Sequence, residues 1–577
     1  MKTLPRLHRL WIRLLDRLQP SETHSMLVWA VVVGFIGAVA TMAFREAIAL
    51  LQRLFVGRAS SFVEMAESVP WYGRIVLPVL GGVIGGLLLQ WSRRLSPGGA
   101  ASDYMEAIAI GDGRIPVRQG LARSASSLFT VASGGSIGRE GSMVHLAAMC
   151  ASFTGRLARF NPARLRLLVA CGAAAGITAA YSAPIAGALF VSEIVLGSIA
   201  MESFGPLMVA SVVSNITMRE LTSYRPPYQM PPFPSIFGRE VLLFVLLGLI
   251  AGALAPQFLR ALQGAKAGFG RLSLPLPAKL GLGGLIVGTI SVWRPEVWGN
   301  GYSVVNSLLH HDWLWWMVLL VLIAKVAATA ATTGSGGIGG VFTPTLFVGA
   351  SLGLLFGHGA HALLPDVTSM PFAYAIVGMG AFLAGATQAP LMAILMIFEM
   401  TLSYSVVLPL MLACVAAYFV ARSVGEHSMY EVTLHRNEQE RARARWHGLK
   451  ISDLVKPTAS VVSASASFAE VERIFLDHPV RYVYVVDDAQ RFLGAISLQE
   501  IKQHLIGRSA APSSTAAELM RRDFPVVLPD ASLGDALQVF LTQGTERLPV
   551  VSSAEERRLL GVVSRSELLL QIQQFAG

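Results

Sequence analysis

Long apolar segments separated by short polar stretches occupy the chain from Met26 to about Arg422. Nine of them stand out as candidate membrane helices: Met26–Phe44, Ile75–Trp91, Leu167–Ala180, Val241–Leu262, Leu280–Val292, Trp313–Ala331, Thr345–Leu364, Ala373–Ala386 and Ser403–Ala421. Several are shorter than the roughly 20 residues that a full membrane crossing needs. Short segments interrupted by Gly and Pro are typical of discontinuous helices that meet at a site near the middle of the membrane. The pattern therefore predicts an α-helical polytopic membrane protein.

The pattern changes after Tyr430. Residues 434–449 belong to a charged stretch and predict a cytoplasmic linker. From residue 450 onward, short Val- and Tyr-rich runs lie between amphipathic helical stretches, a mixture that predicts an α+β fold. This part repeats itself, because GAISLQE at Gly494–Glu500 recurs as GVVSRSE at Gly561–Glu567. We therefore expect two similar domains, at residues 450–510 and 511–577.

The first 25 residues form a separate basic segment. One helical face would carry arginines and the opposite face would carry Leu and Trp; the arginines are Arg6, Arg9, Arg13 and Arg17. Basic amphipathic helices of this kind lie on membrane surfaces. The segment predicts a helix on the cytoplasmic surface, and the alternative is a solvated basic tail.

Composition supports the membrane assignment. The chain is 53% apolar and only 14% charged, which suits a polytopic membrane protein better than a soluble one. The net charge of +10 is concentrated beside apolar segments, where cytoplasmic Lys and Arg are expected, so nucleic acid is not a predicted partner. The three cysteines, which form no CxxC pair, indicate neither a disulfide framework nor a zinc site. No metal or cofactor is predicted.

The membrane part contains an internal repeat. Ala183-Pro184 and Glu193 recur as Ala389-Pro390 and Glu399, 206 residues later. A Gly-rich turn lies upstream of each copy, at Ser133–Ser142 in the first half and at Gly334–Pro344 in the second. A shared order of features predicts two related halves. In transporters such halves often have inverted topology, with binding at their interface.

The turn Ser133–Ser142, SGGSIGREGS, has the character of an anion site. A Gly-rich turn that opens a helix directs several free N–H groups at one point, and the helix dipole adds positive charge. Glu140 lies inside this turn, so its carboxylate can occupy the place of a free anion. Arg139 is its neighbour. The alternative is that Glu140 only caps a helix and that Arg139 is its partner at the membrane surface.

These motifs together resemble the CLC family of chloride channels and chloride/proton antiporters, and within it the bacterial ClcB type. The resemblance covers about residues 26–433 and rests on GREGS at Gly138–Ser142, on Ala179–Glu193, on Gly334–Pro344 and on Tyr430. The C-terminal pair resembles tandem CBS domains. The resemblance implies a fold of two inverted repeats, followed by a cytoplasmic α+β pair.

The resemblance also implies residue roles. Glu140 matches the family's gating glutamate, whose carboxylate competes with chloride and moves away when protonated. The other positions implied to bind the anion are Arg139 and Gly141 beside it, Val341 and Phe342 through their backbone amides, and Tyr430 through its hydroxyl. Hydroxyls and amides hold chloride weakly enough for release.

Two departures from the family pattern concern the pathway. The GSGIPE signature is degraded within Gly98–Glu106, where one register places Gly99 and another places Ser102 at the anion-binding serine; we adopt Ser102. The antiporters' inner proton-transfer glutamate matches Ile194. Glu193, one residue earlier, would point about 100° away on a helix.

In the CBS pair, Ser497 and Ser564 match the usual nucleotide-contacting serines. Glu500 and Glu567 replace the aspartate of that pattern, and their longer side chains can crowd a ribose. We expect either an adenine-nucleotide site or a structural or dimer-contact module.

Three functions are therefore considered. The first is a voltage-gated-type chloride channel gated by Glu140, and the second is a chloride/proton antiporter of the same fold. The third is a CBS-regulated cation transporter, which would need Glu106, Glu193 and Glu399 as ligands. An enzyme is not predicted, because a lone His145 after the turn is more often packed than catalytic. The resemblance further implies a homodimer in the bacterial inner membrane with both termini cytoplasmic.

Overall fold

The computed structural model describes residues 22–57, 61–95, 103–222, 228–229, 231–233, 238–425, 428–430, 450–478, 480–507 and 514–576. The chain divides into two compact units, residues 1–434 and 435–577. The arginines of the predicted N-terminal helix, the whole predicted linker (residues 434–449) and Ser102 lie outside the described residues.

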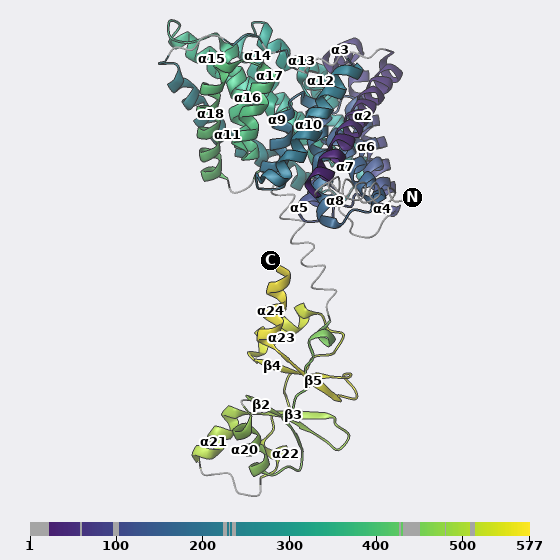
Figure 1. Ribbon diagram of the computed structural model, residues 1–577, viewed down its shortest axis with the longest axis vertical. Coiled ribbons are helices and arrows are strands. Elements are labelled where there is room, and N and C mark those ends of the chain that lie inside the picture. The colour runs from purple at the N-terminus through teal and green to yellow at the C-terminus, as the bar shows by residue number, and fades with distance from the viewer. Residues whose placement is uncertain are drawn as a thin grey trace, which may run out of the picture. The chain divides into compact units, whose positions relative to one another are not determined.

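The first unit is entirely helical in its described part (Figure 1). Its elements are α2 (Glu22–Val56), α3 (Phe62–Ser68), α4 (Trp71–Leu95), α5 (Tyr104–Ala109), α6 (Val117–Ala132), α7 (Glu140–Leu157), α8 (Pro162–Tyr181), α9 (Pro184–Leu189), η1 (Phe190–Val195), α10 (Met201–Thr222), α11 (Val241–Arg271), α12 (Leu276–Trp293), η2 (Pro295–Val297), α13 (Tyr302–His310), α14 (Trp315–Gly334), α15 (Phe342–Leu363), α16 (Pro371–Thr387), α17 (Pro390–Thr401), η3 (Tyr404–Val406) and α18 (Val407–Val424).

The predicted polytopic membrane fold is confirmed. Eight helices of the described part are long and apolar enough to cross a membrane, and shorter apolar helices lie among them. Each of the nine predicted apolar segments falls on a helix. Helix α10, which packs against α2 and α8, was not among the predicted segments, because its polar residues dilute the apolar signal.

Glycines allow several of these helices to touch through their backbones. Where α15 meets α16, a Cβ added to Gly349 would lie 2.5 Å from the carbonyl oxygen of Gly378, and the reverse distance is also 2.5 Å. Larger side chains would push the helices apart. Small residues at such contacts give membrane helices the close packing that replaces hydrophobic attraction in lipid.

The two Gly-rich turns have the same backbone structure. After α6 and after α14, a serine ends the helix and a glycine with positive φ follows: Gly134 at 99° and Gly336 at 102°. The turns also join each other, because Gly138 and Gly340 exchange two N–H···O=C bonds of 2.8 Å. Reciprocal bonds between equivalent residues relate the two halves by a local two-fold axis, as in transporters with inverted repeats.

The repeated glutamates reinforce this symmetry. Glu193 accepts hydrogen bonds from the backbone N–H groups of Leu391 (3.3 Å) and Met392 (2.8 Å) at the start of α17. Glu399 accepts from Ile185 (2.9 Å) and Ala186 (2.8 Å) at the start of α9. Each carboxylate therefore caps a helix of the other half. This use of both groups disfavours the cation-transporter alternative, in which they would be ligands.

The second unit has the predicted α+β fold. Its elements are η4 (Ile451–Leu454), β1 (Val461–Ser463), α20 (Phe468–Asp477), β2 (Tyr482–Val486), β3 (Phe492–Ser497), α21 (Leu498–Gly507), α22 (Ala516–Leu519), α23 (Leu533–Gln543), β4 (Arg547–Val551), β5 (Leu559–Ser564) and α24 (Arg565–Ala576). Strand β2 lies between β1 (parallel) and β3 (antiparallel), and β4 pairs with β5 (antiparallel). The strand pairing shifts register after Val485 in β2 and after Val550 in β4. The two similar domains therefore share this irregularity as well.

Candidate functional site

A cavity of about 220 Å³ lies beside the paired turns. The first residues of α7 line it from one half of the chain, and the first residues of α15 line it from the other. The leading N–H groups of a helix have no acceptor within that helix, and the dipole makes this end positive. Two such ends at one cavity create an environment that favours an anion.

Most of the residues predicted to bind an anion meet here. Those that line the cavity are Glu140, Gly141, Val341, Phe342 and Tyr430. Arg139 does not line it; instead its guanidinium lies over the ring of Tyr302, 5.7 Å from the ring centroid. The predicted contribution of Ser102 falls outside the described residues.

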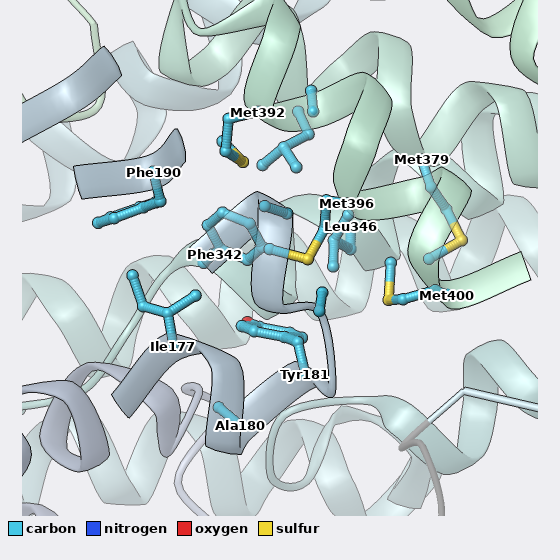
Figure 2. Close-up of a cluster of buried hydrophobic side chains, with 14 of the residues drawn as sticks. Ile177, Ala180, Tyr181, Phe190, Phe342, Leu346, Met379, Met392, Met396 and Met400 are labelled. Atoms are coloured by element: carbon cyan, nitrogen blue, oxygen red, sulfur yellow. The ribbon is translucent and has the colours of Figure 1, made fainter. Parts of the chain in front are cut away.

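Aromatic rings form much of the remaining wall. Figure 2 shows Ile177, Tyr181 and Phe190 around Phe342. The ring of Tyr181 lies 5.1 Å from that of Phe342, and Phe190 meets the ring of Tyr430 edge-on at 5.4 Å. These contacts hold the rings of Tyr181 and Tyr430 in place. The result is a mainly apolar cavity with a few N–H and hydroxyl groups, an arrangement that binds ions without trapping them.

The Glu140 carboxylate is turned toward a different part of the second half. Its side chain is buried, with the residue 3% exposed. Its Oε1 accepts hydrogen bonds from the hydroxyl of Tyr302 (2.6 Å) and from Nδ2 of Asn300 (3.3 Å). Its Oε2 has no hydrogen-bond partner within the described part of the chain. Neither partner was predicted from the sequence, because neither belongs to a recognised motif.

A buried lysine anchors the segment that carries Asn300 and Tyr302 through hydrogen bonds to its backbone. Lys325 of α14 is 0% exposed, and its Nζ donates to the carbonyl oxygens of Val297 (2.9 Å) and Gly299 (2.7 Å). The sequence itself carries a signal for this residue. It is a lone lysine inside the apolar segment Trp313–Ala331, and ionisable residues at such positions are expensive unless they have a partner.

Trp298 connects the same segment to the first Gly-rich turn. The tryptophan is fully buried against Gly134, where an added Cβ would lie 2.5 Å from the indole ring. The turn therefore needs glycine both for its positive φ and for this contact. The backbone N–H of Gly299 also donates to the carbonyl oxygen of Gly134 (3.5 Å), so segment 295–302 packs against the first Gly-rich turn.

The cavity is also lined by polar groups that were not predicted from the sequence to lie there. Asp103 caps α5 by accepting from the N–H of Met105 (3.3 Å), and its carboxylate lies 3.8 Å from the guanidinium of Arg123. His145, which the analysis regarded as a packed residue, is buried, lies edge-on to Tyr104 and also lines the cavity. Apart from Glu140, the charged residues of this wall are thus an ion pair of one acid and one base.

A hydrolase site is not supported by this geometry. Residues 134–138, GGSIG, have the G-x-S-x-G spacing of a nucleophile motif. The hydroxyl of Ser136 is buried and lies 3.2 Å from Oγ1 of Thr329, and its backbone N–H donates to Oγ1 of Thr332. These bonds join the first Gly-rich turn to α14 of the other half, so Ser136 has structural partners rather than a general base.

The serines of the C-terminal pair cap helices. Ser497 Oγ accepts from the N–H of Glu500 (3.2 Å), while the Glu500 carboxylate accepts from the N–H of Ser497 (2.7 Å), forming a capping box at α21. Ser564 Oγ accepts from the N–H of Glu567 (3.3 Å) at α24. Nucleotide contact by these residues stays a prediction.

Helix N-termini that face one cavity from two related halves are the arrangement expected of a membrane protein that handles an anion. The chain belongs to the voltage gated chloride channel family, whose sequence pattern matches residues 81–422. Two CBS domains match residues 451–507 and 516–573. The resemblance noted in the sequence is confirmed, and a family of channels and transporters agrees with the expectation of no enzyme activity.

Two relatives match almost over their whole length. A Ralstonia nicotianae protein named chloride channel protein ClcB-like is 54% identical over 422 residues, which are 72% of this chain and 98% of the relative. The voltage-gated ClC-type chloride channel ClcB of Escherichia coli is 39% identical over 410 residues, or 70% of this chain and 97% of the relative.

Solved structures share the fold. A slow cyanobacterial Cl⁻/H⁺ antiporter is 26% identical with a TM-score of 0.64, covering 71% of this chain and 97% of its own. A eukaryotic CLC transporter is 18% identical with a TM-score of 0.58, covering 94% of this chain and 97% of its own. The second likeness concerns the fold alone.

Proposed function

We propose that this chain is a chloride channel in which chloride crosses passively through the cavity at α7 and α15 and Glu140 is the gate. The observation that carries the proposal is the position of the Glu140 carboxylate, at the first residue of α7 and beside a cavity bordered by two helix N-termini. An ionised carboxylate competes with chloride for such N–H groups, whereas a neutral carboxyl competes poorly. The channel names of the two relatives support the passive mode.

Chloride/proton exchange is the second candidate, supported by the antiporter among the solved structures. Exchange would require a proton to travel inward from Glu140. Ile194, at the position of the antiporters' inner acid, cannot titrate, and the neighbouring Glu193 is used to cap α17. These two residues favour the channel over the antiporter.

The reversal potential separates the two modes. Under opposed chloride and proton gradients, the reconstituted full chain should reverse at the chloride equilibrium potential, because a passive pore couples no other ion. Current–voltage curves in planar bilayers at several pH gradients provide the measurement. A reversal point that moves systematically with the pH gradient would reject the channel and establish coupled exchange.

Tyr430→Phe should weaken chloride binding. The substitution keeps the ring against Phe190 and removes only the hydroxyl. Loss of a hydrogen bond to a charged ligand costs about 1.5–3 kcal/mol, so the dissociation constant should rise by about tenfold or more. Isothermal titration with chloride tests this, with Tyr404→Phe, an exposed tyrosine, as the matched control. Unchanged affinity would mean that the hydroxyl does not contact the anion.

The setting of the channel follows from the same reasoning. The chain is a multi-pass membrane protein, and we propose the bacterial inner membrane as its location, with the CBS pair in the cytoplasm. A homodimer and an adenine nucleotide at Ser497 and Ser564 are expectations that rest on family resemblance. Equilibrium dialysis of the full chain with labelled ATP, and cross-linking in lipid, test them separately.

A further inference from the structure

We propose that Tyr302 and Asn300 form a latch that holds the ionised Glu140 carboxylate away from the chloride path. A fraction of the channels would then be open while Glu140 is still ionised. The inference rests on the proposed role of Glu140 as a gate and adds a second resting place for its charge. The latch consists of the Tyr302 hydroxyl and the Asn300 amide.

The contacts define where the carboxylate rests. Both latch groups donate to the same oxygen, Oε1, at 2.6 Å and 3.3 Å. The shorter distance is typical of a charge-assisted O–H···O⁻ bond. Glu140 itself lines the cavity, but neither Tyr302 nor Asn300 does. The hydrogen bonds therefore draw one carboxylate oxygen toward a segment behind the cavity wall.

The Tyr302 ring is fixed on several sides. Tyr228 meets it edge-on at 4.9 Å, and the Arg139 guanidinium lies over it at 5.7 Å. Its hydroxyl also accepts from Oγ1 of Thr343 (3.5 Å), and that oxygen lies 2.9 Å from the hydroxyl of Tyr181. Thr343 follows Phe342 at the start of α15. The hydroxyl chain thus connects the latch to the same helix end that borders the cavity.

The latch segment is anchored independently of Glu140. Lys325 donates to the carbonyl oxygens of Val297 and Gly299, three residues and one residue before Asn300, and Trp298 packs against Gly134. A preorganised donor loses little entropy when the carboxylate arrives. This anchoring makes the segment a fixed receptor for the moving side chain rather than a loop that follows it.

The latch changes the gating equilibrium in a defined way. Without it, an ionised carboxylate has only the anion-binding N–H groups as partners, so the gate opens when the carboxyl is protonated. With it, the ionised form has a second site that leaves the anion position to chloride. The titratable groups around Glu140 are Arg139 and the four tyrosines Tyr181, Tyr228, Tyr302 and Tyr430. His145, Tyr104 and the ion pair of Asp103 with Arg123 share the cavity wall.

Tyr302→Phe tests the latch, because it removes the hydroxyl and keeps the ring. Loss of a hydrogen bond to a charged group shifts an equilibrium by about tenfold or more. We expect the ratio of open to closed gates at neutral pH to fall by about that factor. Chloride efflux from liposomes should slow at neutral pH and recover in acid, so the pH dependence becomes steeper. Tyr228→Phe is the matched control, since its hydroxyl has no hydrogen-bond partner in the described part, and it should behave as the native chain.

A second variant separates the latch from a general packing effect. In a Glu140→Gln background the gate no longer ionises, so adding Tyr302→Phe should leave efflux unchanged at every pH. Equal slowing by Tyr302→Phe in both backgrounds would overturn the latch. If Glu140→Gln alters gating but Tyr302→Phe alone does not, the latch is wrong and the proposed gate survives. If Glu140→Gln itself has no effect, the proposed gate fails and the latch fails with it.

Discussion

The variant Glu140→Gln is expected to conduct chloride about tenfold faster than the native chain at neutral pH and to lose most of its pH dependence. An amide cannot ionise, so it competes poorly for the N–H groups at the start of α7. A competing interaction of about 1.4 kcal/mol corresponds to a tenfold change in occupancy. In the native chain, conduction should rise as the pH is lowered, because protonation removes the same competitor.

Chloride efflux from liposomes, followed with a chloride electrode from neutral pH down to about pH 5, measures this effect. Glu202→Gln is the matched control, because Glu202 is an exposed acid in the first turn of α10. The control should keep native rates and native pH dependence. Native behaviour of Glu140→Gln would mean that the carboxylate is only a helix cap.

Lys325→Met should destabilise the membrane domain strongly. The substitution keeps the length of the side chain but leaves the carbonyl oxygens of Val297 and Gly299 without their donor. Each buried group left unpaired costs about 1–3 kcal/mol, so the expected loss for the two carbonyls is about 2–6 kcal/mol. Because the same carbonyls precede Asn300, the surviving folded protein should also show the steeper pH dependence expected of Tyr302→Phe.

The thermal midpoint of the detergent-solubilised chain, read from monodisperse protein remaining after heating, reports the stability change. Lys266→Met serves as the control, since Lys266 is exposed on α11 and surface substitutions usually change stability by no more than about 0.5 kcal/mol. A midpoint for Lys325→Met equal to that of the control would show that the two carbonyls find other donors.

The sequence by itself determined the membrane fold, the division into two halves and the CBS pair. Apolar length, Gly and Pro positions and Val-rich runs are local signals, and they survive whatever the tertiary structure is. The repeat was visible in the constant spacing of 206 residues between Glu193 and Glu399, which is also a property of the sequence alone. The resemblance to the CLC family also indicated five proposed anion-binding residues, including Val341 and Tyr430, that line one cavity.

Only the tertiary structure decided which groups each charge meets. Glu140 is bonded to residues 160 and 162 positions later, and Glu193 caps a helix about 200 residues away. Such pairings depend on which helix ends face each other, and the spacing of residues along one helix carries no information about its neighbour. Lys325 was visible in the sequence as a charge in an apolar segment, but its partners are backbone carbonyls, which every residue possesses. The physical reason is that local periodicity encodes which face of an element is buried, whereas the contact across the two-fold axis exists only once both halves have folded together.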